Sequence, residues 1–234
     1  MLIVQCFLFG DGGVTAQGAN VFNMALVGTV GGWAIYRAVS RCLPGLRGRV
    51  AAVAFAGWCS TVLASLACVG QLAWSGTVEW SVGFTAMTGI HMLIGLGEGL
   101  ISALAFLAIA RTRPELAASP NQSPVSSRIG GVVGFGLVVS VGLAVFVAPF
   151  ACPWPDGLER VAARLGFEHK AGGVILPAPL RDYTLPGCKS PAVATAVAGA
   201  SGALVVFCLA LLLSRALVPK RVSGGLECAQ SGDP

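Results

Sequence analysis

The chain has 234 residues, of which 55% are hydrophobic and only 11% are charged. A typical globular domain carries roughly 25% charged residues, so this composition excludes an ordinary water-soluble domain. The net charge of +5 does not indicate nucleic-acid binding, because the basic residues form no single patch and lie between apolar runs.

Long apolar runs predict an all-α fold, a polytopic membrane helix bundle in the lipid bilayer. The first run, residues 1–9, is shorter than the roughly 20 residues that a crossing needs, and is interpreted as the end of a truncated helix. Five complete transmembrane helices are expected at about 15–39, 50–74, 82–110, 130–150 and 192–213.

The basic residues predict the orientation of these spans. Three groups of them, within 37–49, 111–128 and 215–221, lie on one side of the membrane if the five spans alternate. By the positive-inside rule that side is the cytoplasm. The connection 76–80 and the loop 151–190 are then external, and the C-terminus of this multi-pass cell-membrane protein is cytoplasmic.

The same pattern divides the chain into four units. These are a transmembrane domain, a cytoplasmic linker, a module of two transmembrane helices around the external loop, and a cytoplasmic tail, at 1–113, 114–127, 128–215 and 216–234.

The first expected span contains a row of amides at three-residue spacing, formed by Gln17, Asn20 and Asn23. Polar side chains inside a membrane mark either a pathway or contacts between helices. Asn20 and Asn23 are interpreted as packing contacts. Asp11 is expected to cap the start of this span.

The third expected span carries His91 and Glu98, seven residues apart and therefore on one helix face. Two interpretations stay open. The pair lines a polar cavity or ion path, or it belongs to a hydrogen-bond network that fixes helix packing.

The external loop contains a short amphipathic helix pattern. Asp156 and Glu159 have the spacing of a capping box. The apolar positions that follow share one helical face, which we expect to lie on the outer membrane surface: Leu158, Val161, Ala162 and Leu165. Cys152 and Cys188 stand at the two ends of the loop, and either a disulfide or two independent thiols fits that placement.

Motifs for enzymatic chemistry are missing from the sequence. It has no GxxxxGK[ST] phosphate loop, GxSxG elbow, CxxC pair or HExxH pair. The two histidines, His91 and His169, are far apart, so no metal ligands are assigned. An enzyme is not expected, and an intramembrane enzyme using His91 and Glu98 is the most distant alternative.

Three stretches resemble known families. Residues 7–25, which begin Phe7-Leu8-Phe9-Gly10-Asp11-Gly12-Gly13, resemble a characteristic block of the CbiM/NikM family, and 91–100 resembles a second one. The loop, with 155–159 and 180–187, resembles the PDGLE domain of CbiN/NikN-type subunits.

The resemblance implies the substrate-binding component of an energy-coupling factor transporter, which imports Co²⁺ or Ni²⁺ without a cofactor. Its partners would be a CbiQ-like transmembrane coupling subunit and a CbiO-like ATPase. In this family the metal is held by an amino-terminal Met-His segment and a histidine upstream of the Gly-Asp-Gly-Gly block. Neither has a counterpart here, so we expect a truncated gene model or an internal start, and no tight metal binding. The alternative function is a non-transporting membrane scaffold or remnant subunit.

Overall fold

The structure is a computed structural model that describes residues 1–112, 114, 129–151, 154–170, 172 and 176–217. All regular secondary structure among these residues is helical, and they contain no β-strand. Nearly all of the expected linker 114–127, the tail after residue 217, and Cys152 lie outside the described residues.

The chain begins with a short helix made of α1 (Leu2–Val4) and η1 (Gln5–Phe9). It ends at Gly10, whose φ of 72° is a left-handed conformation that glycine adopts without strain. After a turn, α2 (Gln17–Asn20), the π-helical η2 (Val21–Gly28) and α3 (Thr29–Cys42) follow one another without a break. These three elements occupy the first expected span.

Two long helices, α4 (Gly45–Trp74) and α5 (Trp80–Thr112), form a closely packed hairpin, and α3 packs on α4. Small residues permit the close approach. A Cβ built on Gly57 would lie 3.2 Å from the Cα of Gly99, and one on Gly99 would lie 2.5 Å from the Ala54 carbonyl oxygen. Such glycine contacts between helices are typical of membrane bundles.

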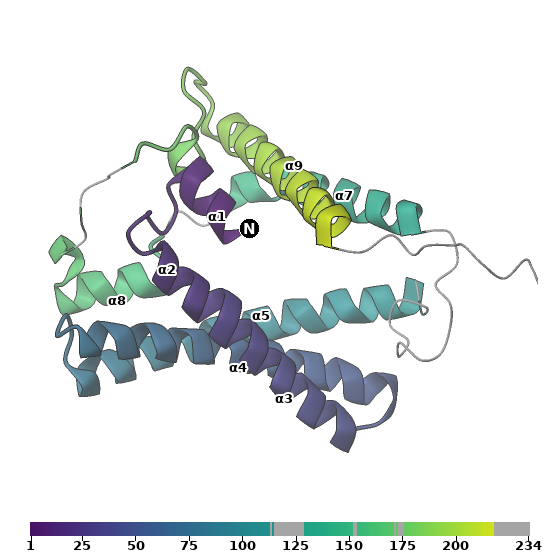
Figure 1. Cartoon of the computed structure of the whole chain (residues 1–234), viewed down its shortest axis with the longest axis horizontal. Helices are drawn as coiled ribbons and strands as arrows, with labels where there is room; N and C mark the ends of the chain where they lie inside the picture. Colours follow the sequence, from purple (N-terminus) through teal and green to yellow (C-terminus); the bar gives the residue numbers. More distant parts are fainter. Residues whose placement is uncertain (113, 115–128, 152–153, 171, 173–175, 218–234) are drawn as a thin grey trace, which may run out of the picture.

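A second hairpin consists of α7 (Ile129–Phe146), the short η3 (Ala148–Phe150) and α9 (Pro191–Leu217). Figure 1 shows α7 and α9 side by side, in a layer separate from α4 and α5. Among the described residues, four helices are long and apolar enough to cross a membrane: Gly45–Trp74, Trp80–Thr112, Val133–Phe150 and Pro191–Leu217. The remaining expected span, 15–39, is divided among α2, η2 and α3, none of which alone has that length.

Between α7 and α9 the loop contains α8 (Gly157–Leu165), η4 (Glu168–Lys170) and η5 (Arg181–Tyr183). Figure 1 shows α8 lying along the α4–α5 hairpin, while the later part of the loop lies near α1 and one end of α9. The Lys170 Nζ donates to the Thr77 carbonyl oxygen at 3.3 Å. The loop and the α4–α5 turn therefore lie at the same end of the molecule.

Candidate functional site

The loop helix α8 is fixed at both ends by its own sequence. Asp156 is the N-cap: its Oδ1 accepts from the Glu159 backbone N–H at 2.7 Å, and the Asp156 N–H donates to Glu159 Oε2 at 3.2 Å. Gly166 ends the helix with φ 72°. This capping box satisfies backbone donors that the first turn would otherwise leave free.

The apolar face of α8 packs on protein, not on the outer membrane surface as the sequence suggested. Val161 is 1% exposed and shares a buried cluster with Val69 of α4 and Met87 of α5. Six partly buried side chains surround this cluster: Cys68, Val78, Ala86, Ile90, Leu165 and Phe167. Full burial of a valine side chain contributes roughly 1.5–3 kcal/mol, so hydrophobic contact holds α8 on the α4–α5 hairpin.

His91 lies under the first turn of α8. Its Nδ1 is 2.8 Å from the Met87 carbonyl oxygen, one helical turn earlier, and because a carbonyl only accepts, Nδ1 is the donor. The Nε2 edge faces Gly157, where a Cβ would lie 3.0 Å from Nε2. His91 therefore contacts the loop between α7 and α9.

Glu98 has a different environment, two turns further along α5. Its Oε2 accepts a hydrogen bond from the Thr61 hydroxyl of α4. Glu98 is exposed, so the other described residues cover little of its surface. The structure thus gives His91 and Glu98 separate contacts, and a shared ion path stays a prediction.

The later part of the loop contacts the Gly-Asp-Gly-Gly block. The Leu180 N–H donates to the Leu8 carbonyl oxygen at 3.0 Å, and the Tyr183 ring stacks on Phe9 with centroids 4.4 Å apart. Asp182 and Tyr183 have φ of 54° and 56°, which is unfavourable for side chains other than glycine. This strained backbone places the Tyr183 ring against Phe9.

Asp11 takes part in this contact and does not cap the first span. The N-cap of α2 is Ala16, with no side-chain hydrogen bond. The Tyr183 hydroxyl instead donates to Asp11 Oδ2 at 3.4 Å. Burial, opposed by a hydrogen bond from Gln5 and reinforced by the Asp11 charge, raises the pKa of the Tyr183 phenol.

The three amides of the first span have different partners. Asn23, 4% exposed, exchanges two hydrogen bonds with Gln71 of α4, at 3.1 and 2.9 Å. Asn20 Nδ2 lies 3.4 Å from the Gly12 carbonyl oxygen. The buried Gln17 Nε2 has no hydrogen-bond partner among the described residues. Gln71, the partner of Asn23, could not be predicted from the sequence, and neither could Thr61 beside Glu98 nor Gly157 beside His91, because pairing across helices depends on the packing.

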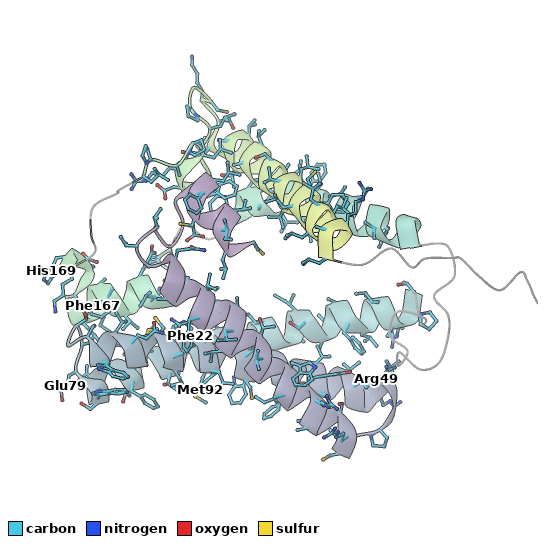
Figure 2. The ribbon with its side chains drawn as sticks, viewed as in Figure 1. Phe22, Arg49, Glu79, Met92, Phe167 and His169 are labelled. Carbon is cyan, nitrogen blue, oxygen red and sulfur yellow. The ribbon has the colours of Figure 1, made fainter. Side chains whose placement is uncertain are left out.

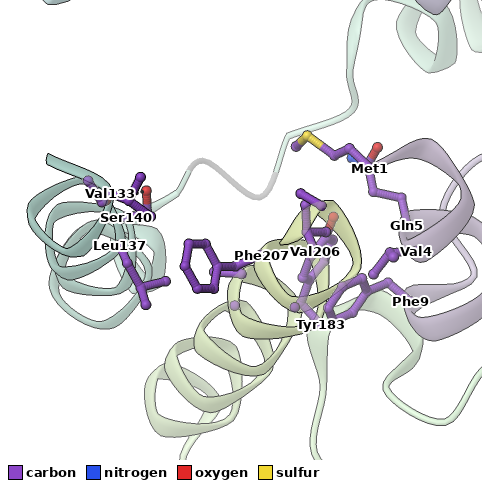
Figure 3. A pocket seen from close by; sticks show the side chains of 15 residues that line it. Met1, Val4, Gln5, Phe9, Val133, Leu137, Ser140, Tyr183, Val206 and Phe207 are labelled. Carbon is purple, nitrogen blue, oxygen red and sulfur yellow. Dashed lines mark hydrogen bonds between the residues drawn. The ribbon is translucent and has the colours of Figure 1, made fainter. Parts of the chain in front are cut away.

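An apolar cavity of about 510 Å³ lies between η1, α7 and α9, and Figure 3 shows the side chains that line it. Phe9, Tyr183, Leu137 and Phe207 are among its lining residues, whereas His91 and Glu98 are not. No three His, Cys, Asp or Glu side chains gather as metal ligands anywhere in the described ranges.

The remaining predicted site residues lie in the loop. His169 is exposed in η4, and Figure 2 shows it near Phe167, at the same end of the molecule as Glu79. The Cys188 thiol donates to the Ser190 carbonyl oxygen at 3.4 Å. Because Cys152 is not among the described residues, its pairing with Cys188 stays a prediction.

Two family models match the chain. "Cobalt uptake substrate-specific transmembrane region" matches residues 1–116, and "PDGLE domain" matches 130–218. The two matches leave residues 117–129 between them, and the linker predicted from the sequence is 114–127. No solved structure matches.

Curated proteins with similar sequences have transport names. The chain is 34% identical over 217 residues to a "Putative fused nickel transport protein NikMN" of Archaeoglobus fulgidus, covering 92% of this chain and 69% of the relative. It is 30% identical over 200 residues to the "Fused nickel transport protein NikMN" of Rhodobacter capsulatus, covering 76% and 57%. A "Putative cobalt transport protein CbiM" of Halobacterium salinarum is 32% identical over 118 residues, covering 47% and 54%. The chain thus spans roughly half to two thirds of the length of these relatives.

Proposed function

The chain belongs to the CbiM family of cobalt-uptake transmembrane proteins and carries a PDGLE domain behind it, and from this premise we propose that it is the membrane component of a cobalt or nickel importer. The metal ion is the transported substrate. It would be taken up at the outer side, where the PDGLE loop lies, and released to the cytoplasm.

One observation carries this proposal beyond the family match. The PDGLE loop contacts the transmembrane domain at both stretches that resemble CbiM/NikM blocks. Its helix α8 covers His91 on α5, and its later part pairs with Leu8 and stacks on Phe9. Both contacts support a fused protein in which the outer module and the transmembrane domain act as one unit on the same ion.

The energy for import would come from partner subunits. The sequence contains no phosphate loop of the P-loop type, and a separate CbiO-like ATPase would supply ATP hydrolysis. A CbiQ-like membrane subunit would transmit its motion to this chain. In the orientation predicted from the basic loops, the ATPase lies on the side of the C-terminus.

Ion accumulation in cells tests this function. Cells that lack their own cobalt and nickel importers are made to express the full chain together with the coupling subunit and the ATPase. We expect cobalt or nickel to accumulate above the level of cells that lack only this chain, and to do so only with an active ATPase. If the three subunits co-purify but no ion accumulates, the proposal is wrong and the chain is a non-transporting scaffold.

A further inference from the structure

Glu98 lies near the middle of a helix long enough to cross the membrane. The helix α5 has 33 residues. At a rise of 1.5 Å per residue, Glu98 is about 27 Å from one end of α5 and about 21 Å from the other. A hydrocarbon core is about 30 Å thick, so the carboxylate lies at membrane depth.

The described residues supply little to stabilise a carboxylate there. One oxygen accepts from the Thr61 hydroxyl, which also lies 3.2 Å from the Gly57 carbonyl oxygen of its own helix. The salt bridge found among the described residues, between Arg181 and Asp182, is in the loop. A single neutral donor does not offset the loss of water around a carboxylate in lipid, and such groups almost always have a partner.

The helix face that follows Glu98 is apolar and uncovered. Ile101, one turn after Glu98, is 68% exposed. One turn before Glu98, Ile94 is 38% exposed and contacts α8, since a Cβ on Gly157 would lie 3.0 Å from Ile94 Cδ1. Within the described chain α5 packs mainly on α4 and α8, and the contact with α8 ends near Ile94. We define the Glu98 face as Glu98 and Ile101.

We propose that the Glu98 face is the docking site for a transmembrane helix of a partner subunit that presents a lysine or arginine to Glu98. Charge complementarity selects this occupant, because a cation supplies the partner that lipid cannot. A second copy of the chain fits less well, since a two-fold contact through this face would bring two carboxylates together. The inference rests on the proposed function only in that the partner is the coupling subunit of the importer.

Site-specific crosslinking tests the docking site in an otherwise unaltered chain. A photoreactive residue replaces Ile101, and a control chain carries it at Phe135 of α7, which is 71% exposed. Each chain is co-expressed with the coupling subunit and the ATPase, illuminated in membranes and analysed by mass spectrometry. We expect position 101 to crosslink to a transmembrane helix of the coupling subunit next to a lysine or arginine, and position 135 not to crosslink there.

Charge variants test the chemistry of the contact. Glu98→Gln keeps the size and the acceptor oxygen but removes the charge, and Glu98→Leu removes both. Glu79→Gln is the matched control, because Glu79 lies at the end of the hairpin and accepts from Ser81 at 2.8 Å. We expect Glu98→Gln to lower the co-purified coupling subunit about tenfold, Glu98→Leu at least as much, and Glu79→Gln not to change it.

Each other outcome overturns the inference. If position 101 crosslinks only to lipid or to a second copy while the subunits still co-purify, the docking site is wrong and the proposed function stands. If Glu98→Gln retains the subunit at the wild-type level, the cationic partner is wrong. If the wild-type chain does not co-purify with the coupling subunit at all, both the inference and the proposed assembly fail.

Discussion

Gly157 in the first turn of α8 lies directly against the imidazole of His91 on α5. A Cβ at position 157 would be 2.8 Å from Cε1 and 3.0 Å from Nε2 of that ring, and 3.0 Å from Ile94 Cδ1. Separations under 3.0 Å essentially do not occur for real Cβ atoms. A side chain at position 157 would therefore force the His91 ring or α8 to move, and the glycine permits the close approach of the loop to the transmembrane domain.

Gly157→Ala is expected to lift the start of α8 away from α5. The added methyl group overlaps the His91 ring, and overpacking of this kind costs about 1–3 kcal/mol. Thermal unfolding of the purified chain in detergent measures the loss. In the double variant with His91→Ala the space is restored, so we expect much of the loss to be recovered.

Gly134→Ala is the matched control, because nothing lies within 4 Å of a Cβ built on that helical glycine. It should leave the unfolding temperature unchanged or raise it slightly, because alanine is the better helix former. Additive effects of Gly157→Ala and His91→Ala would contradict a direct contact between the two residues.

Val161→Ala is expected to loosen α8 on the hairpin and expose the thiol of Cys68, which packs against the same buried cluster. Loss of two buried methyl groups removes about 1.6 kcal/mol at about 0.8 kcal/mol per group. If labelling of Cys68 requires α8 to undock, its rate should rise about tenfold. Maleimide labelling followed by mass mapping measures Cys68 separately from the other cysteines.

Leu158→Ala provides the comparison on the same helix. Leu158 is 36% exposed whereas Val161 is 1% exposed, so its truncation should accelerate Cys68 labelling much less. Equal labelling rates in the two variants would mean that α8 is not held through Val161.

The phenol of Tyr183 should ionise at a higher pH than an unfolded tyrosine. Burial is the main cause, and the nearby Asp11 carboxylate adds to it. In a Tyr36→Phe background Tyr183 is the remaining tyrosine, and its phenolate absorbance can be followed as the pH rises. Asp11→Asn should lower the pKa of Tyr183, because it removes the charge that disfavours the phenolate.

The sign for stability follows from the raised pKa. Since the folded state resists ionisation, the stabilisation is complete below about pH 10, the ordinary tyrosine value, and is lost as the pH rises through the higher pKa of the folded state. Glu168→Gln, a charge change elsewhere in the loop, is the control. A Tyr183 titration that Asp11→Asn leaves unmoved would exclude the Asp11 contact.

The spans and the loop helix could be predicted because their signals are local. Apolar length identifies α4, α5 and α9 within a few residues of their ends. The capping box of Asp156 and Glu159 depends on residues three apart, so sequence alone is enough to predict the start of α8. The role of Asp11 was wrong because its partner, Tyr183, is 172 residues away.

The location of the loop helix shows what sequence periodicity leaves open. Periodicity reveals an apolar face on α8 but does not say whether lipid or protein covers it. Val161 meets Val69 and Met87 only because the packing of α4 on α5 brings these two residues together. The same limit applies to His91 and Glu98. Their shared helix face does not predict that His91 contacts Gly157 or that Glu98 accepts from Thr61.

The paired amides of Asn23 and Gln71 join η2 to α4, and we expect them to be coupled energetically. Each side chain donates to and accepts from the other, at 3.1 and 2.9 Å. Either Asn23→Leu or Gln71→Leu leaves one amide in an apolar contact without its partner. Interhelical hydrogen bonds in membrane proteins contribute about 0.6 kcal/mol on average and up to about 1.7 kcal/mol.

A double-mutant cycle separates this coupling from changes in packing. Each single variant should lower the free energy of unfolding, and the double variant should lose less than the sum, because no unpaired amide remains. Asn20→Leu is the comparison, since the long 3.4 Å contact of Asn20 with Gly12 predicts a smaller loss. If the two single losses add without coupling, the amides do not pair in the membrane, and η2 is held on α4 by its other contacts, such as the 2.8 Å hydrogen bond from Ser60 to the Gly28 carbonyl oxygen.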